Sequence, residues 1–266
     1  MIRMATIASG SSGNCTYIGT GDTHLIIDAG ISMKRIREGL NELGVDLGDL
    51  DAIFVTHEHS DHIAGLPMIW KHHQIPIYST AGTMKAVRGT GSSRAIADEA
   101  FHVIRAGDEV PIGDLAIRSF PISHDAADPV AYVASVGDRR VAVATDMGRF
   151  DAGVEKELTG LDALVIEANH DIRMLQAGPY PWPLKQRILS DYGHLSNDAS
   201  GELLIRILND HMKGILLGHL SAQNNLPELA YETVRVEIEL SDAPYHGSDL
   251  PIEVAPRAGL SRIIEV

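Results

Sequence analysis

The sequence predicts an α/β protein built as a four-layer sandwich, in which two sheets pack together and helices cover the outside. Three observations indicate this fold class. Short apolar runs of strand length alternate with amphipathic segments of helical length along almost the whole chain. No proline-rich or low-complexity stretch divides the sequence. The composition, 44% hydrophobic and 22% charged, is that of an ordinary globular chain. We therefore expect a single domain that spans residues 1–266.

The first part of the chain predicts a meander at the edge of a sheet, followed by a helix. The polar turns SGSSGN and GTGD separate three short apolar runs. Strands are expected at Met4–Ala8, Thr16–Ile18 and His24–Ile27. Ser32 is a residue type favoured at N-caps, and it predicts a helix from there to about Leu43.

The middle of the chain continues the alternation. The apolar run Leu50–Thr56 ends in HEHSDH, which indicates a buried strand that delivers its C-terminal end to a site. The next helix is expected from His62 to His73. A strand at Ile75–Ser79 and a helix through Val87 follow. Further strands are expected at Phe101–Ile104, Leu115–Pro121, Val130–Val136 and Arg140–Thr145.

The last part repeats the same pattern of strands and helices. Its expected strands are Leu161–Ala168 and Gly214–Gly218. Its expected helices are Trp182–Asp191, Asn197–His211 and Leu226–Val236.

Charge and cysteine content exclude several classes of function. Lys and Arg number 22 against 36 Asp and Glu, and the resulting net charge of −14 argues against unspecific coating of nucleic acid. The single cysteine, Cys15, excludes internal disulfides and cysteine-based zinc sites. The apolar runs are shorter than the ~18 residues of a membrane helix, and the start lacks the pattern of a secretory signal. We expect a cytoplasmic protein with no membrane partner, and a homo-oligomer is compatible with the sequence.

The strongest signal is the sequence Thr56-His57-Glu58-His59-Ser60-Asp61-His62. In extended chain His57 and His59 point the same way, whereas Asp61 and His62 lie where a helix begins and can face a second point nearby. One segment can thus supply ligands to two metals. A solvated turn is the weaker interpretation, because unpaired histidines packed so closely would repel one another once protonated.

Three later residues each end an apolar strand, where α/β sheets hold their sites. They are His124, Asp146 and His219. Each alone is better explained as a polar cap on a strand end. Three such placements after the histidine cluster favour a site instead.

Together these residues predict two metal sites in each chain. The first metal would take His57, His59 and His124; the second would take Asp61, His62 and His219; Asp146 would bridge both. Nitrogen and carboxylate ligands suit Zn²⁺, Mn²⁺ or Fe²⁺. Two such ions would share a water and lower its pKa to about 7, which produces a hydroxide nucleophile. The predicted reaction class is metal-assisted hydrolysis.

These residues resemble the metallo-β-lactamase superfamily, whose His-x-His-x-Asp-His signature, later His, bridging Asp and final His match the seven residues in order. The resemblance implies an αββα sandwich with a dinuclear site at one edge. It leaves the substrate open, because thioesterases, lactonases and phosphodiesterases share the ligand set.

Other segments resemble the YycJ (WalJ) branch of this superfamily. These segments are Ser11–Asn14, Glu167–Asp171, Gly193–Asn197 and His219–Ser221 with Asn224 and Asn225. The branch implies a phosphodiesterase with DNA exonuclease activity. It places Asn14 near the metals, gives His194 the role of a phosphate-facing histidine, and marks Asn169 as a neighbour of the site.

The residues themselves support this in part. His194 precedes Ser196, the expected cap of an amphipathic helix, so the imidazole and free backbone N–H groups could hold a phosphate oxygen; the alternative is a hydrogen bond within the cap. His170 with Asp171 could support a ligand from behind or begin a helix. Asp28 could likewise orient a ligand or simply form a turn.

Two departures narrow the choice within the family. Nucleases of the β-CASP type insert a whole domain between the bridging Asp and the last His, but Asp146 to His219 holds only a few elements. The long Gly/Pro-rich arm with which ribonuclease Z grips transfer RNA is also missing. The first departure excludes the β-CASP family, and the second disfavours transfer RNA processing.

The sequence therefore predicts a nuclease that acts on the ends of DNA, in which a metal-bridging hydroxide attacks a phosphodiester. His194 would bind phosphate and Asp61 would steer the hydroxide. The alternative enzyme is a glyoxalase II-like thioesterase or lactonase that uses the same site on a carbonyl carbon. A metal-holding sensor or interaction protein is the third interpretation, and the complete ligand set disfavours it.

Overall fold

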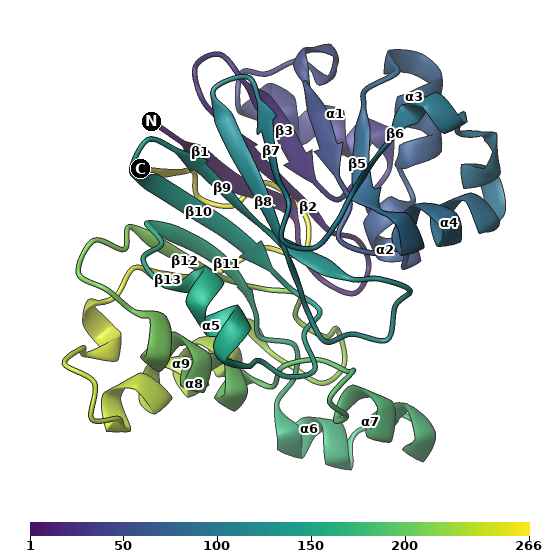
Figure 1. The fold of residues 1–266 in the computed structure, drawn as a ribbon. Coiled ribbons are helices and arrows are strands. Elements are labelled where there is room, and N and C mark those ends of the chain that lie inside the picture. Colours follow the sequence, from purple (N-terminus) through teal and green to yellow (C-terminus); the bar gives the residue numbers. More distant parts are fainter.

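Two seven-stranded mixed sheets pack face to face in the computed structural model, which describes residues 1–266 (Figure 1). The first sheet has the order β14-β1-β2-β3-β4-β5-β6. Its strands are β1 (Arg3–Ala8), β2 (Cys15–Gly19), β3 (His24–Ile27), β4 (Ala52–Phe54), β5 (Ile77–Thr80), β6 (Phe101–Ile104) and β14 (Ile264–Glu265). The last strand of the chain thus pairs with the first.

The second sheet has the order β13-β12-β11-β10-β9-β8-β7. Its strands are β7 (Glu109–Ile112), β8 (Leu115–Pro121), β9 (Val130–Val136), β10 (Arg139–Ala144), β11 (Ala163–Glu167), β12 (Gly214–Gly218) and β13 (Ile252–Val254). Strands β7 to β10 form an antiparallel meander, and β10 to β13 run parallel.

Helices cover the outer face of each sheet (Figure 1). On the first sheet they are α1 (Met33–Glu42), α2 (Ser60–Ile63), α3 (Leu66–His73) and α4 (Ala81–Gly89). On the second they are α5 (Ala152–Leu158), α8 (Asn197–Ile207) and α9 (Pro227–Leu240). Two short helices, α6 (Ile172–Ala177) and α7 (Trp182–Ile188), project from one end of the sandwich. Four 3₁₀ turns lie at Leu47–Asp49, Gly91–Ala95, Asp98–Ala100 and Gly247–Asp249.

The apolar core has three parts, one for each interface of a four-layer sandwich. One cluster lies between the first sheet and its helices and includes Ile36 and Leu40 of α1. A second lies between the other sheet and its helices. The third joins the two sheets, where Phe54 of β4 meets Tyr132 of β9 edge to face at 5.2 Å. The predicted αββα fold class is therefore confirmed.

The structure differs from the sequence-based expectation around residue 65. The helix expected at His62–His73 is two helices, α2 and α3. Gly65 lies at the break, where a Cβ would come within 2.4 Å of the Ile31 carbonyl oxygen, and its N–H donates to Ala29 O at 2.7 Å. The Ala29–Ile31 segment packs closely against Gly65, and this contact ends α2. The hydrophobic pattern around residue 65 does not reveal a contact with a segment so far away in the sequence.

Four elements were not expected from the sequence, namely β7, α5, β13 and β14, and α6 was expected only as one of two interpretations of His170 with Asp171, which is its N-cap. Each has seven residues or fewer. So short a segment shows at most two turns of a helix or two repeats of a strand, and its periodicity is therefore weak.

The strand directions bring several loops to one edge of the sandwich. Strands β4, β8, β10, β11 and β12 end at this edge, and the loops that follow four of them carry His57, His124, Asp146 and His219. Glu167 is the last residue of β11. No helix is both long and apolar enough to cross a membrane.

Candidate metal centre

The seven side chains predicted as metal ligands converge at this edge. Their ligand atoms fall into overlapping groups in which all atoms lie within 4.8 Å of one another. The groups are His57-His59-His124, Asp61-His62-His219, His57-His62-Asp146 and Asp146-Glu167-His194-His219. The first two are the triads proposed from the sequence, and both draw on loops that are far apart along the chain.

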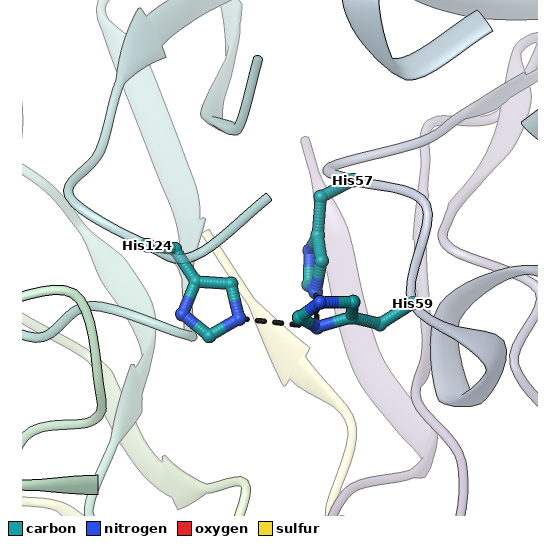
Figure 2. A group of neighbouring side chains, drawn as sticks. All are labelled: His57, His59 and His124. Carbon is teal, nitrogen blue, oxygen red and sulfur yellow. Dashed lines mark hydrogen bonds between the residues drawn. The ribbon is translucent and has the colours of Figure 1, made fainter. Parts of the chain in front are cut away.

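Three imidazole nitrogens face one another in the first triad (Figure 2). His57 Nε2 lies 3.0 Å from His59 Nδ1, and His124 Nε2 lies 3.2 Å from the same atom. His124 is held from behind, because its Nδ1 lies 3.1 Å from the carbonyl oxygen of Gly193. This contact leaves His124 Nε2 free to face the other two rings.

Carboxylates join the second triad to the first. Asp61 Oδ2 lies 3.4 Å from His219 Nε2 and 3.6 Å from His62 Nε2. Asp146 lies between the groups: its Oδ2 is 3.4 Å from His62 Nε2, while its Oδ1 is 3.4 Å from His219 Nε2 and 3.9 Å from His124 Nε2. This is the position that a bridging carboxylate requires.

Asp28 contacts His62 from the side away from the cluster. Its Oδ2 accepts hydrogen bonds from His62 Nδ1 at 2.7 Å and from Thr56 Oγ1 at 2.8 Å, and its Oδ1 accepts from Thr56 N at 2.8 Å. A carboxylate that binds one ring nitrogen of a histidine fixes the ring and leaves the other nitrogen for a metal. The geometry therefore fits the orienting role better than a simple turn.

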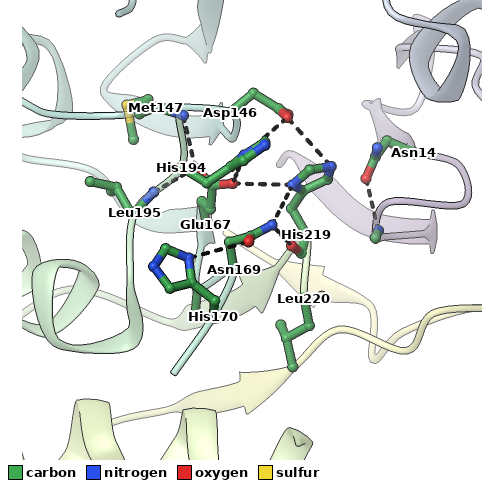
Figure 3. Close-up of polar contacts among 12 residues, drawn as sticks. Asn14, Asp146, Met147, Glu167, Asn169, His170, His194, Leu195, His219 and Leu220 are labelled. Atoms are coloured by element: carbon green, nitrogen blue, oxygen red, sulfur yellow. Dashed lines mark hydrogen bonds and ion pairs between the residues drawn. The ribbon is translucent and has the colours of Figure 1, made fainter. Parts of the chain in front are cut away.

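Glu167 also contacts the cluster, although the sequence alone placed it in a motif and gave it no role. It is fully buried, and its Oε1 lies 2.7 Å from His194 Nδ1 and 3.1 Å from His219 Nδ1 (Figure 3). Its Oε2 accepts from Met147 N at 2.8 Å and Leu195 N at 3.2 Å. One carboxylate thus orients two histidines. The sequence feature that could have identified Glu167 is its position at the end of a strand, which it shares with Asp146 and His219.

The remaining predicted neighbours divide into two groups. Asn14 and Asn169 touch the cluster: Asn14 Nδ2 lies 3.1 Å from His62 Nε2, and Asn169 Nδ2 donates to His219 O at 2.9 Å. His170 and Ser196 do not touch it. The ring of His170 lies 3.3 Å from the Asn169 side chain, and its carbonyl accepts from Asn197 N at 3.0 Å. Ser196 caps α8 by accepting from Ala199 N at 3.2 Å.

The backbone is strained at three of these positions. Only four residues other than glycine have positive φ, and three of them are Asp28 (62°), Asp146 (61°) and His219 (54°). The left-handed region is costly for residues with a Cβ, and such residues cluster at functional sites. Two of these strand ends therefore adopt an unfavourable turn that aims Asp146 and His219 into the cluster, and the third aims Asp28 at the back of the His62 ring.

Burial and charge separate the two halves of the cluster. Burial, with the charges of neighbouring histidines, lowers the pKa of His57 well below its usual value, and burial likewise lowers the pKa of His124. Burial alone would also lower the pKa of His62, but Asp28, Asp146 and Asp61 outweigh it and raise this pKa to about 9. The pKa of His219 is raised for the same reason, by Asp146, Asp61 and Glu167.

The donor set fits divalent metal ions. Asp146 Oδ2 is buried and accepts no hydrogen bond, although an unpaired buried carboxylate oxygen is costly. His59 Nδ1 is faced by two other imidazole nitrogens, and a single proton cannot satisfy all three. A cation among these atoms would satisfy both, and imidazole with carboxylate suits zinc, manganese or iron.

A pocket of about 320 Å³ opens beside the cluster. Asp61, Asp146, His194 and His219 line one side of it. Residues of α7 and of the turn before it line another side. A small molecule or one unit of a polymer can therefore reach the candidate ligands.

Comparison with known proteins gives a consistent result. A family model described as a beta-lactamase superfamily domain matches residues 23–214. The exodeoxyribonuclease WalJ of Streptococcus pneumoniae is 39% identical over 240 residues, which are 90% of this chain and 89% of the relative. The exodeoxyribonuclease YycJ of Bacillus anthracis is 37% identical over 238 residues, with the same coverage of 90% and 89%. The relatives thus match nearly the whole chain.

Solved structures match over the same length. The metallo-beta-lactamase fold protein YhfI of Bacillus subtilis superposes with a TM-score of 0.71 at 14% identity and covers 98% of both chains. A diphosphatase of the PhnP family superposes with a TM-score of 0.65 at 17% identity and covers 100% of this chain and 99% of that one. At such low identity these structures support the fold alone.

Proposed function

Because the chain belongs to the beta-lactamase superfamily, and its relatives of 37–39% identity are exodeoxyribonucleases, we propose that it is a metal-dependent phosphodiesterase that hydrolyses DNA from its ends. The observation that carries the proposal is the convergence of His57, His59, His124, Asp61, His62, His219 and Asp146 on one edge of the sandwich, beside an open pocket. A cytoplasmic location suits this substrate. Because the ligands come from loops of both sheets, we propose that residues 1–266 act as one domain.

Two divalent ions, Zn²⁺ or Mn²⁺, held by these side chains would act as Lewis acids and supply a nucleophile at neutral pH. Asp61 lines the pocket, and the contact of its Oδ2 with His219 fixes the carboxylate. From there it can accept a hydrogen bond from the attacking water and hold it in line with phosphorus.

His194 is the residue we assign to the phosphate. Its Nδ1 is engaged by Glu167 at 2.7 Å, so Nε2 is the nitrogen left for a substrate. The ring lines the pocket and is only partly buried. Its Nε2–H can donate to a non-bridging phosphate oxygen, and the buried Glu167 carboxylate fixes the ring for this contact by binding Nδ1.

An acyl thioester or lactone is not the favoured substrate. The ligand set alone would serve a carbonyl carbon equally well, but the relatives that match nearly the whole chain are nucleases. His194, with Nδ1 held by Glu167, also offers its Nε2 as a hydrogen-bond donor, which suits the anionic oxygens of a phosphodiester.

The test is hydrolysis by the purified chain of end-labelled single- and double-stranded DNA, with RNA and S-acyl glutathione beside them, in Mn²⁺ or Zn²⁺. We expect DNA to be shortened from an end and the His59→Ala variant to lose this activity. His211→Ala is the matched control, because His211 is exposed and lies outside the cluster. Cleavage of the thioester alone, or equal DNA cleavage by the His59→Ala variant, would reject the proposal.

A further inference from the structure

The pocket beside the metal ligands has two chemically different sides. Fifteen residues line it, and its three hydrophobic members are Tyr180, Leu184 and Ile188. All three belong to α7 and the turn before it, in the segment that projects from the end of the sandwich (Figure 1). The opposite side is formed by the metal-ligand cluster. A nucleotide has the same division, with an anionic phosphate at one end and a flat apolar base at the other.

We propose that this pocket binds the terminal nucleotide of the DNA strand, with the nucleobase against Tyr180 and a phosphate on Arg187. The proposal rests on the proposed nuclease function and adds to it the residues that select the chain end. Neither Tyr180 nor Arg187 belongs to the candidate metal ligands.

Arg187 is the only Lys or Arg that lines the pocket. Its Nε forms an ion pair with Asp125 Oδ2. Asp125 in turn lies 3.5 Å from His124 Nε2 through its Oδ1, so the pair holds the guanidinium beside the first triad. The two Nη groups of Arg187 make no hydrogen bond with the protein and remain available for a bidentate contact with phosphate.

The α7 helix presents one face to the pocket. Leu184, Arg187 and Ile188 have the spacing i, i+3, i+4 and all line it. Trp182 is the most exposed aromatic residue of this segment, at 68%, but it does not line the pocket. Tyr180, in the turn that leads into α7, is therefore the one aromatic ring of the segment that a ligand in the pocket can contact.

Size and charge favour a nucleotide over an acyl chain. The volume of about 320 Å³ lies near the lower end of the about 300–1,000 Å³ typical of small-molecule sites, so it admits one unit of a polymer. Arg187 is the only Lys or Arg beside the aspartates of the pocket, Asp61, Asp125 and Asp146, so an anionic ligand would be held there by the free Nη groups together with the metal ions that the carboxylates would bind. Stacking on an aromatic ring accepts any base, as an exonuclease requires.

The test compares two single-stranded oligonucleotides that differ only in the terminal residue, which is thymidine in one and an abasic tetrahydrofuran in the other. Each end is modified in turn, and KM and kcat are measured for the wild-type chain, Tyr180→Ala and Tyr180→Phe. We expect the abasic end to raise the wild-type KM roughly 5-fold to 100-fold, from the usual strength of base stacking on aromatic residues. The Tyr180→Ala variant should lose this discrimination, and the Tyr180→Phe variant should keep it.

Trp182→Ala is the matched control, since it removes an exposed ring two residues from Tyr180 that does not line the pocket. It should discriminate between the two ends as the wild type does. Equal KM values of the wild type for both ends, with DNA still cleaved, would overturn the inference and leave the nuclease function standing. Failure to cleave either oligonucleotide would remove both. An increased KM of Tyr180→Ala for S-acyl glutathione would instead place an acyl group in the pocket.

A second measurement addresses Arg187. If it contacts a phosphate, Arg187→Gln should weaken binding of the oligonucleotide and reduce the slope of log K against log salt by about 0.7. Arg173→Gln, an exposed arginine of α6 that does not line the pocket, should leave that slope unchanged. An unchanged slope in Arg187→Gln would exclude the phosphate contact, even if the activity fell through the loss of the Asp125 ion pair.

Discussion

Replacing Glu167 by glutamine should destabilise the protein and weaken its hold on metal, although the two side chains have nearly the same shape. Each oxygen of Glu167 accepts two hydrogen bonds. Oε1 lies 2.7 Å from His194 Nδ1 and 3.1 Å from His219 Nδ1, and Oε2 accepts from Met147 N at 2.8 Å and Leu195 N at 3.2 Å. If the NH₂ group faces the backbone, it meets the N–H donors of Met147 and Leu195, which lose their acceptor. If it faces the imidazoles, His194 and His219 must accept at Nδ1, which puts the proton on Nε2 and takes His219 Nε2 from the metal.

The size of the effect follows from these contacts. Two buried donors lose their acceptor, and an unsatisfied buried group costs about 1–3 kcal/mol, so we expect a loss of roughly 2–5 kcal/mol in the free energy of unfolding. His219 also loses the carboxylate that orients its ring. Loss of such a partner typically lowers metal affinity about 10-fold to 100-fold.

Urea unfolding of the chelator-treated protein measures the first effect, and competition with a chromogenic chelator measures the second. Glu155→Gln is the control, because Glu155 pairs with Arg206 at the surface and should contribute no more than about 1 kcal/mol. If Glu167→Gln unfolded at the same urea concentration as the wild type and bound metal equally well, Glu167 would not hold the two histidines as we describe.

Three further predictions concern the pair behind the cluster, a close backbone contact and the metals themselves. The pKa of His62 in the folded, metal-free protein is raised from 6.5 to about 9 despite its burial, chiefly by Asp28. The pair should therefore stabilise the fold fully below pH 6.5 and less as the pH rises through 9, and urea unfolding across this range should show a slope that Asp28→Asn reduces. A Cβ on Gly30 would lie 1.6 Å from Asp61 O, so Gly30→Ala should cost more than the about 1–3 kcal/mol of ordinary overpacking, whereas Gly21→Ala, with open space around it, should be nearly neutral in the same assay. Removal of metal by a chelator should lower Tm by roughly 5–10 °C relative to protein held at 100-fold the metal Kd, and an unchanged Tm in calorimetry would contradict metal binding by the folded chain.

The sequence was sufficient for the fold class and for the members of the ligand cluster, because both leave local marks. A run such as Val141–Ala144 is apolar throughout, as a buried strand must be, and the polar residue after it lies at the strand end. The histidine spacing in His57–His62 is likewise a local property. Such features can be recognised in the sequence without knowing what packs against the segment.

The supporting residues leave no such mark. Glu167 ends a strand as many surface residues do, and only the arrival of His194 and His219 from other loops gives it two partners. The break at Gly65 depends on the Ile31 carbonyl, 34 positions away in the chain. Tyr180 lines a pocket together with Asp61, although the two residues are more than a hundred positions apart in the sequence. Each is a property of tertiary contact, which periodicity does not encode.

Backbone strain links the fold to the metals. A left-handed conformation costs a residue with a Cβ on the order of 1–3 kcal/mol, and it persists only where the surroundings hold it. At Asp28 the surroundings are complete, because its two oxygens accept three hydrogen bonds from Thr56 and His62. At Asp146 they are not, because Oδ2 is buried without a hydrogen-bond partner, while the carboxylate as a whole lies among the imidazoles of His62, His124 and His219. A bound cation would supply what Asp146 lacks, so we expect metal to stabilise the turn at Asp146 far more than the turn at Asp28, and hydrogen exchange of the amides that follow each residue should slow on metal binding at the first and hardly change at the second.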